Sequence, residues 1–408
     1  MRVLGARILT AVCCLSFYSG FSSSQTLSGN AIDNIDAIMK ASLREYSIPG
    51  AVAVVTNGER IIYVSAFGFA DVLNQKPMST DSIFRIASMT KPITSTGLML
   101  LVEGGEVKLE DSISNHLSDL PPFEIFDEFD FDDASFTTNL AEKEVTIKHL
   151  LTHTSGMAYD FNSFELAASG APLFNRNRYL LQHEPGERWT YGPSTNLLGD
   201  VIVTKSNAGL FEFFEKELFL PLGMDETVFE VPATEAERVV TIHQKTGSTF
   251  VEAQNPQVIS SPELGHGGLN STASDYSKFM RLFLNNGLSD SGERLLKAET
   301  IDEMASNQIG NLKAELQPEA RPQLAKAFPQ FPGVDNWGLG FQLAGADGEF
   351  QRNKGSMSWA GIFNTKFWID RKANIAAAIF MQYLPFDDEH HLDVLKKFEA
   401  AVYKNLNQ

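Results

Sequence analysis

The sequence predicts a mixed α/β fold of the α+β type, in which both ends of the chain form one antiparallel sheet flanked by helices. Near the start, two β-rich runs at 51–55 and 60–69 are joined across Asn57-Gly58, which is a strong hairpin signal. Three further apolar runs stand near the end, at 337–343, 366–369 and 375–383. We therefore expect the sheet from about 30–87 and 330–408, and a mainly helical middle region at about 88–329.

The first 24 residues have the pattern of a signal peptide. Two arginines come within the first seven residues, an apolar run follows at 8–17, and three serines stand at 22–24. A buried N-terminal helix is the alternative. A transmembrane helix is not expected, because about ten apolar residues are too few to span a bilayer. Cys13 and Cys14 are the only cysteines of the chain. We expect residues 25–408 to be the mature, exported chain, periplasmic or secreted, without any thiol, disulfide or cysteine-based metal site.

The composition indicates a globular enzyme and excludes polyanionic partners. Of the 408 residues, 43% are hydrophobic and 21% are charged, which is typical of a chain with a sizeable core. The formal net charge is -18. Nucleic acids and anionic membranes bind basic surfaces, so neither is expected as a partner, and no stable membrane insertion is expected.

Helical periodicity accounts for most of the remaining chain. The first helix is expected at 32–46, ended by Pro49-Gly50, and the last at 387–406. The middle region shows the same periodicity at 94–103, 147–152, 195–206, 211–218 and 274–285. His390 and His391, near the last helix, are expected to be exposed.

The segment 121–133 has a different composition. It intersperses phenylalanines among acidic residues and fits neither a helix core nor a strand. We interpret it as a solvated loop with a few buried aromatic anchors. A lid over the functional site is the alternative, because long loops in compact domains are often functional.

Ser88-Met89-Thr90-Lys91 offers a nucleophile together with its base. A hydroxyl becomes a useful nucleophile only when a neighbouring base takes its proton, and residues i and i+3 share one face of a helix. These four residues follow a strand-like sequence and begin an apolar helix. The positive end of that helix dipole would face the oxyanion formed on attack. Such a pattern also arises by chance, but it occurs once in this chain.

Tyr191 is the candidate second member of the proton relay. It stands in Trp189-Thr190-Tyr191-Gly192, shortly after Pro185-Gly186, on a loop rich in glycine and proline. A phenol with a pKa near 10 is a poor base unless a cation lowers that pKa, and Lys91 is the obvious cation. The alternative is a tyrosine at the edge of the core whose hydroxyl is bonded to the backbone.

Six short motifs occur in a fixed order along the chain. They are Phe84-Arg85-Ile86-Ala87-Ser88-Met89-Thr90-Lys91; Leu150-Leu151-Thr152-His153-Thr154-Ser155-Gly156; Pro185-Gly186 through Trp189 and Tyr191; Pro221-Leu222-Gly223-Met224; Gly267-Gly268-Leu269 with Ser271-Thr272 and Asp275-Tyr276; and Trp359-Ala360-Gly361. In this order and spacing, residues 30 to 385 resemble the β-lactamase/penicillin-binding-protein superfamily of serine hydrolases, and specifically its family VIII carboxylesterases.

The resemblance implies a β-lactamase/DD-peptidase-like fold and an acyl-enzyme on Ser88. It implies that Lys91 and Tyr191 form the proton relay, and which of the two is the formal base stays open. It also implies an oxyanion hole made by the backbone N–H groups of Ser88 and Ile362. We expect no metal and no cofactor.

Two departures from the lactamase pattern decide the expected substrate. Where β-lactamases usually have Tyr-x-Asn, this chain has Tyr191-Gly192-Pro193, which lacks the amide. Where they have Lys-Thr-Gly, it has Trp359-Ala360-Gly361, so an indole and a methyl replace a cation and a hydroxyl that bind a carboxylate. We expect Pro193, Trp359, Ala360 and Gly361 to contact the substrate. Small neutral acyl esters are favoured over carboxylate-bearing β-lactams.

Two other motifs suggest rival sites that we set aside. His149 and His153 have the i, i+4 spacing of a zinc-binding helix, but no glutamate lies between them, so structural roles are expected. Lys245-Thr246-Gly247 precedes Gly267-Gly268, whereas the family's Lys-Thr-Gly box follows that element. We interpret it as a turn.

The leading functional hypothesis is therefore a carboxylesterase whose partner is a small-molecule ester. A β-lactamase or D-alanyl-D-alanine peptidase is the second hypothesis, and a catalytically inactive binding protein is the third. Acyl transfer to an alcohol stays open because it uses the same acyl-enzyme. The sequence does not determine the acyl length, the alcohol or the oligomeric state.

Overall fold

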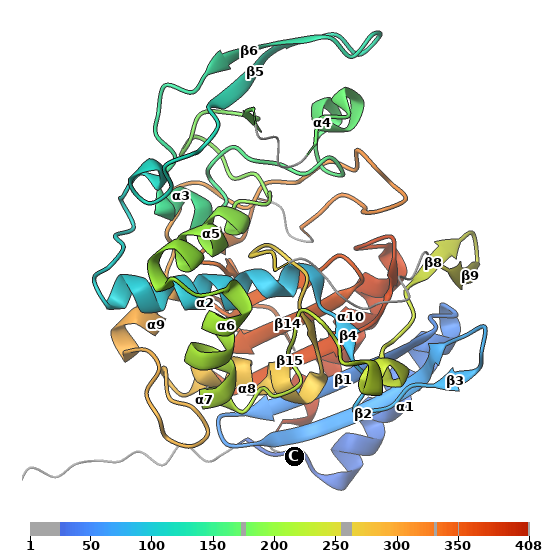
Figure 1. The fold of residues 1–408 in the computed structure, drawn as a ribbon. Coiled ribbons are helices and arrows are strands. Elements are labelled where there is room, and N and C mark those ends of the chain that lie inside the picture. The colour runs from blue at the N-terminus through green and yellow to red at the C-terminus, as the bar shows by residue number, and fades with distance from the viewer. Residues whose placement is uncertain (1–24, 173–176, 254–262, 330–332, 350, 407–408) are drawn as a thin grey trace, which may run out of the picture.

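The computed structural model describes residues 25–172, 177–253, 263–329, 333–349 and 351–406 (Figure 1). Its main feature is an eight-stranded antiparallel sheet in the order β11-β12-β13-β14-β15-β1-β2-β3. The strands are β1 (Gly50–Asn57), β2 (Ile61–Asp71), β3 (Lys76–Pro77), β11 (Asn336–Trp337), β12 (Gln342–Leu343), β13 (Met357–Gly361), β14 (Thr365–Asp370) and β15 (Ile375–Phe380). In the register of β1 and β15, Val52 lies opposite Phe380. The expectation that both chain ends form one sheet is confirmed.

Helices cover both faces of this sheet. Helices α1 (Gly29–Glu45) and α10 (Glu389–Asn405) lie on one face, and α2 (Thr90–Glu103) and α8 (Ala273–Leu284) lie on the other (Figure 1). Every residue of β1 and β15 is buried, which is why their sequences are apolar without alternation. Successive side chains serve different cores: Val52 belongs to the core on the α8 side and Ala53 to the core under α1 and α10.

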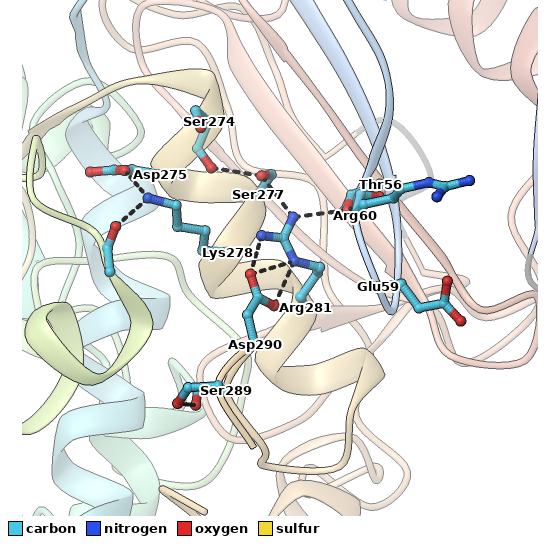
Figure 2. Close-up of polar contacts among 12 residues, drawn as sticks. Thr56, Glu59, Arg60, Ser274, Asp275, Ser277, Lys278, Arg281, Ser289 and Asp290 are labelled. Atoms are coloured by element: carbon cyan, nitrogen blue, oxygen red, sulfur yellow. Dashed lines mark hydrogen bonds and ion pairs between the residues drawn. The ribbon is translucent and has the colours of Figure 1, made fainter. Parts of the chain in front are cut away.

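Helix α8 is fixed to the sheet by a buried arginine (Figure 2). The Arg281 guanidinium donates to the Thr56 hydroxyl on β1 at 3.0 Å and to the Ser277 hydroxyl at 3.2 Å. Its Nε donates to the Asp290 carboxylate at 2.8 Å, so the buried charge is paired. One turn earlier, Lys278 donates to Asp275 at 3.0 Å. Of these contacts, the bond from Arg281 to Thr56 joins α8 to the sheet, and the Lys278–Asp275 pair lies within α8.

The middle region contains most of the helices, separated by loops and short strands. Its helices are α3 (Ile147–Leu151), α4 (Phe164–Ser169), α5 (Thr195–Ser206), α6 (Leu210–Phe214), α7 (Leu220–Leu222) and α9 (Ala298–Met304). Outside the main sheet, the short strands are β4 (Phe84–Arg85) paired with β10 (Asn270–Ser271), β8 (His243–Thr246) with β9 (Thr249–Glu252) and β16 (Tyr383–Leu384), and β5 (Phe123–Phe129) with β6 (Phe136–Leu140) and β7 (Tyr179–Leu181).

The interpretation of 121–133 as a loop is wrong, because most of it is strand β5, which pairs with β6 in a hairpin that extends from the top of the molecule in Figure 1. The register shifts between Phe126 and Phe129, and this bulge lets both rings contact Phe136, at centroid distances of 5.1 and 5.8 Å. The bulge breaks the strict alternation by which strands are recognised in sequence. Aromatic pairs across the hairpin then supply its apolar contacts.

His391 is also placed differently from the expectation. Its side chain is fully buried, because Val394, Leu395 and Phe398 share the inner face of α10 with it. The Asp387 carboxylate lies 3.7 Å from its Nδ1. His390 is partly exposed and stacks on Tyr46.

The proposed signal peptide, with Cys13 and Cys14, lies outside the described residues. Within the described ranges, no helix has the length and apolar character needed to cross a membrane.

Candidate active site

Ser88 lies in a tight 3-10 turn, Ala87–Met89, that leads directly into α2. The residue before it, Ala87, has a φ of 45°, a left-handed conformation that is strained for a residue with a Cβ. The turn is held by a hydrogen bond from the Met89 N–H to the Ile86 carbonyl at 2.9 Å. It presents a half-buried Ser88 at the N-terminal end of α2, where the helix dipole favours negative charge.

Lys91, in the first turn of α2, is a buried cationic side chain beside Ser88. Its Nζ lies 3.1 Å from Ser88 Oγ, 2.9 Å from Tyr159 Oη and 2.8 Å from the His266 carbonyl oxygen. Burial lowers the pKa of Lys91 well below its ordinary value. A neutral amine has two hydrogens and one lone pair. Donation to Tyr159 and to the His266 carbonyl leaves the lone pair for the Ser88 proton.

Tyr159 and His266 extend this chain of hydrogen bonds. Tyr159 Oη lies 2.9 Å from His266 Nδ1. Burial lowers the pKa of His266 to about 3, and burial raises the pKa of Tyr159. The imidazole is therefore neutral and the phenol protonated, so Tyr159 donates to His266 Nδ1 and accepts from Lys91.

Sequence reasoning missed both residues. Tyr159 is 68 positions from Lys91 and 107 from His266, so no spacing rule connects them. The available signal was an imidazole in the glycine-rich stretch Gly265-His266-Gly267-Gly268, where a side chain with no local structural role is unusual.

The Tyr191 ring faces Lys91, whose Nζ lies 4.9 Å from the centroid of the ring. Gln317 accepts a hydrogen bond from the Tyr191 N–H at 3.1 Å, and Asn162 donates to the Tyr191 carbonyl at 2.9 Å. Gly192 is required next to it, because a Cβ there would lie 2.1 Å from the Met157 carbonyl oxygen. These contacts fix the loop that carries the phenol.

The Tyr191 hydroxyl is buried and makes no hydrogen bond with good geometry to any described residue. Burial raises its pKa, while the nearby Ser88 hydroxyl and Trp359 indole act in the opposite direction. The phenol is thus close to Ser88 but misaligned with it, as catalytic groups often are before substrate binds. At neutral pH it holds its proton.

Strand β13 approaches the Ser88 turn closely because of Gly361. A Cβ at this position would lie 2.3 Å from the Ile86 carbonyl oxygen and 2.4 Å from Thr365 Oγ1. The absence of a side chain therefore lets the end of β13 pack on the segment that leads to Ser88. Ile362, the next residue, is half-buried beside this contact.

Trp359 on β13 forms an aromatic cluster with Tyr191. Its ring centroid lies 4.8 Å from that of Tyr191, 4.7 Å from Trp337 and 6.4 Å from His153. The indole is 6% exposed, and its N–H has no hydrogen-bond partner among the described residues. Ala360 is buried on the same strand, and Pro193 is buried just before α5.

The rival motifs have structural surroundings. His149 forms a capping box with Thr146 at the start of α3, and His153 packs against Tyr191 at 4.9 Å between centroids. Lys245 and Thr246 belong to strand β8, and only Gly247 lies in the turn of the β8–β9 hairpin, so the interpretation of this motif as a turn is correct only for the glycine. Lys245 pairs with Asp388. Across the part of the chain that the structure describes, no cluster of three or more His, Cys, Asp or Glu side chains could hold a metal ion.

Comparisons with known proteins agree with this fold. A family model described as Beta-lactamase matches residues 34–401. Monacolin J acid methylbutanoyltransferase of Aspergillus terreus is 26% identical, over 92% of this chain and 96% of its own length. Esterase EstB of Burkholderia gladioli is 27% identical, over 85% and 88%. A solved simvastatin synthase from Aspergillus terreus, the LovD6 mutant, superposes with a TM-score of 0.77 at 26% identity, covering 93% of this chain and 98% of that one. The expected β-lactamase/DD-peptidase-like fold is thereby confirmed.

Proposed function

The chain belongs to the β-lactamase family, an enzyme family of serine hydrolases and acyltransferases, and on that basis we propose that it is a carboxylesterase acting on small neutral acyl esters through an acyl-enzyme on Ser88. The observation that carries the proposal is the buried Lys91 amine, whose Nζ lies 3.1 Å from Ser88 Oγ. A hydroxyl beside a neutral amine at the start of a helix is an activated nucleophile.

In the proposed acylation step, Ser88 Oγ attacks the ester carbonyl carbon while its proton passes to Lys91 Nζ. The carbonyl oxygen becomes an oxyanion, which accepts hydrogen bonds from the backbone N–H groups of Ser88 and Ile362. The tetrahedral intermediate collapses, the bond to the alcohol oxygen breaks, and that oxygen takes a proton from Tyr191, which Lys91 then reprotonates. Tyr191 has a proton to give at neutral pH because burial raises its pKa, and Lys91 suits the base role because its pKa is lowered.

Deacylation repeats these proton transfers with water as the attacking group. Water loses a proton to the relay, its oxygen bonds to the acyl carbon, and Ser88 leaves with the returned proton. An alcohol can take the place of water in this step, which would make the protein an acyltransferase. The sequence likeness to a methylbutanoyltransferase favours acyl transfer as the second candidate activity.

Trp359 supports esters rather than β-lactams as substrates. It places an aromatic face 4.8 Å from the Tyr191 ring, where a lactamase has a cation for the substrate carboxylate. Pro193 also has no side-chain amide. A carboxylate entering this site would lose hydration without gaining a partner, whereas a neutral ester would gain apolar contact.

A panel of p-nitrophenyl esters of graded acyl length, measured beside a chromogenic cephalosporin, tests the proposal. We expect kcat/KM for a short ester to exceed that for the cephalosporin, and Ser88→Ala to lower ester turnover by roughly 10³-fold or more. Mass spectrometry after reaction with an organophosphonate should find the adduct on Ser88. Labelling at another residue, or cephalosporin turnover that rivals the esters, would contradict the proposal.

Replacing Trp359 tests the basis of the specificity. Trp359→Lys should lower kcat/KM for neutral esters by about 1 to 3 kcal/mol of transition-state stabilisation, because an apolar contact is lost. β-Lactam turnover should rise only slightly, since Pro193 still lacks the amide. Trp359→Phe, which keeps an aromatic face, is the matched control. Equal ester kinetics in the wild type and the lysine variant would place Trp359 outside the substrate site.

A further inference from the structure

A cavity of about 150 Å³ lies behind Trp359. Its wall is formed by β13, the middle of α10, the segment around Phe328 and the segment from Val334 to Asp347. Phe328, Phe386 and Leu395 supply its apolar walls, and Trp359 and Ala360 form the side toward the active site. Ser88, Lys91 and Tyr191 do not line it, so the cavity is distinct from the catalytic groups.

Two rings connect this cavity to the catalytic groups. Trp359 and Phe328 both line it, and both contact the Tyr191 ring, at centroid distances of 4.8 and 5.6 Å. The ladder between β12 and β13 ends at Ser358, so no pairing with β12 covers β13 at Trp359 and Ala360. The Trp359 and Phe328 rings therefore form the boundary between the Tyr191 phenol and the cavity.

In the buried part of the cavity wall, the cations are paired with carboxylates, and Asp335 accepts hydrogen bonds from the Gln342 side chain at 2.6 Å and the Gly345 N–H at 2.9 Å. Asp347 and Lys396, which also line the cavity, are exposed to solvent. Lys366, which lies opposite Ala360 in the sheet, contacts Asp387 at 2.5 Å, and only 13% and 2% of their side chains are exposed. Arg352 and Glu399 form a bidentate ion pair, in which Arg352 Nε and Nη2 donate to the two carboxylate oxygens of Glu399 at 2.9 and 2.8 Å. A charged ligand in this part of the cavity would have to displace one partner of a buried ion pair. The other partner would then be a buried charge without a counterion, which is strongly unfavourable. The buried part of the cavity therefore fits an uncharged group.

The volume sets the size of that group. A dry cavity of about 150 Å³ in another protein holds one benzene molecule. The cavity behind Trp359 thus has room for about six heavy atoms, such as a phenyl, a cyclohexyl or a branched alkyl group.

We propose that this cavity binds the alcohol portion of the ester, and that this portion is an uncharged ring or branched alkyl group of about six heavy atoms. The inference rests on the proposed esterase function. The group that protonates the leaving oxygen must lie beside it, and Tyr191 is the phenol whose ring contacts both Trp359 and Phe328. The leaving alcohol, rather than the acyl group, is therefore directed into the cavity. In acyl transfer, the acceptor alcohol occupies the same cavity.

Two series of esters test the assignment in the full-length mature enzyme. One series keeps a butanoyl group and varies the alcohol from methyl through isobutyl and cyclohexylmethyl to benzyl. The other keeps the methyl alcohol and varies the acyl chain from two to eight carbons. For the wild type, kcat/KM should rise along the alcohol series. The ester of a benzyl alcohol that carries a carboxylate should have a lower kcat/KM than the ester of the neutral benzyl alcohol.

Filling the cavity should remove the preference for large alcohols. Ala344, a half-buried residue of the cavity wall outside the catalytic machinery, is replaced in Ala344→Phe. We expect kcat/KM for the benzyl ester to fall about 10-fold or more, while values for the methyl esters of all acyl lengths stay within about twofold. Ala373→Phe, in the turn at the other end of the β14–β15 hairpin, is the matched control and should change neither series. Leu395→Ala, which enlarges the cavity, should instead favour alcohols larger than benzyl.

The outcomes separate the two proposals. Losses along the acyl series instead of the alcohol series would assign the cavity to the acyl group and overturn the inference. So would an alcohol preference that Ala344→Phe leaves intact. Full activity in Ser88→Ala, or no turnover of any ester by the wild type, would instead overturn the esterase function itself.

Discussion

Gly361→Ala tests whether the close packing of β13 on the Ser88 turn creates the oxyanion hole. The added Cβ would meet the Ile86 carbonyl oxygen at 2.3 Å and Thr365 Oγ1 at 2.4 Å, whereas ordinary contact begins at 3.4 Å. Both neighbours are held in place, since Ile86 accepts the hydrogen bond that closes the turn and Thr365 is a buried residue of β14. The strand end must therefore move by about 1 Å, and the N–H of Ile362 moves with it.

The expected effect is a loss in kcat with little change in KM. Removing one oxyanion-hole donor costs roughly 10²- to 10³-fold in kcat, or about 2.7 to 4 kcal/mol of barrier. Steady-state hydrolysis of a short p-nitrophenyl ester measures both constants, and a thermal melt shows whether the variant is folded. Gly29→Ala is the matched control, because a Cβ at Gly29 would meet nothing within 4 Å. A folded Gly361→Ala enzyme with wild-type kcat would refute the reasoning.

Three further predictions concern the relay and the N-terminal segment. Lys91→Ala and Tyr191→Phe should each abolish most turnover, and the double variant should be little worse than either, because the two residues act as a unit; strictly additive losses would argue against the relay. Since burial lowers the pKa of Lys91 and raises that of Tyr191, kcat/KM should rise with pH through the lowered lysine pKa and should not fall near pH 10, where an ordinary phenol ionises. A pH profile that declines there would assign the acid to another group. We also propose that the exported chain begins near Gln25, which intact-mass measurement of secreted or periplasmic material checks; material that keeps both cysteines would contradict it.

The sheet could be predicted from sequence because its signals are local. Asn57-Gly58 specifies a hairpin, and the apolar run that begins at Ile375 specifies a strand buried on both faces. Helix α5 coincides with the predicted range 195–206, since its periodicity is uninterrupted. In contrast, β5 depends on a bulge that restores contacts between Phe126 and Phe136, and such a correction is invisible to a rule of alternation.

The candidate site also contains residues that local sequence patterns predict and residues that only the folded chain brings together. Ser88 and Lys91 are one helical turn apart in sequence, so their proximity follows from helix geometry alone. Tyr159 and His266 reach Lys91 from distant segments, and only the folded chain shows that the Tyr159 hydroxyl and the His266 carbonyl oxygen lie beside the amine together with Ser88 Oγ. The cavity behind Trp359 has no sequence signature, because its walls come from separate parts of the chain.

The pairing of β1 with β15 has a consequence for how the polypeptide reaches its native state. These neighbouring strands are separated by nearly the whole sequence, so the central ladder forms only after the C-terminal part of the chain is available. Until then, β1 and β2 present an unpaired apolar edge that favours aggregation, and a chain shortened before Phe380 would keep that edge permanently. Helices α1 and α10 lie side by side, so a short linker could join the two ends and new termini could be opened at an exposed loop. Such a permuted chain would make the central ladder an early, local contact and should fold faster.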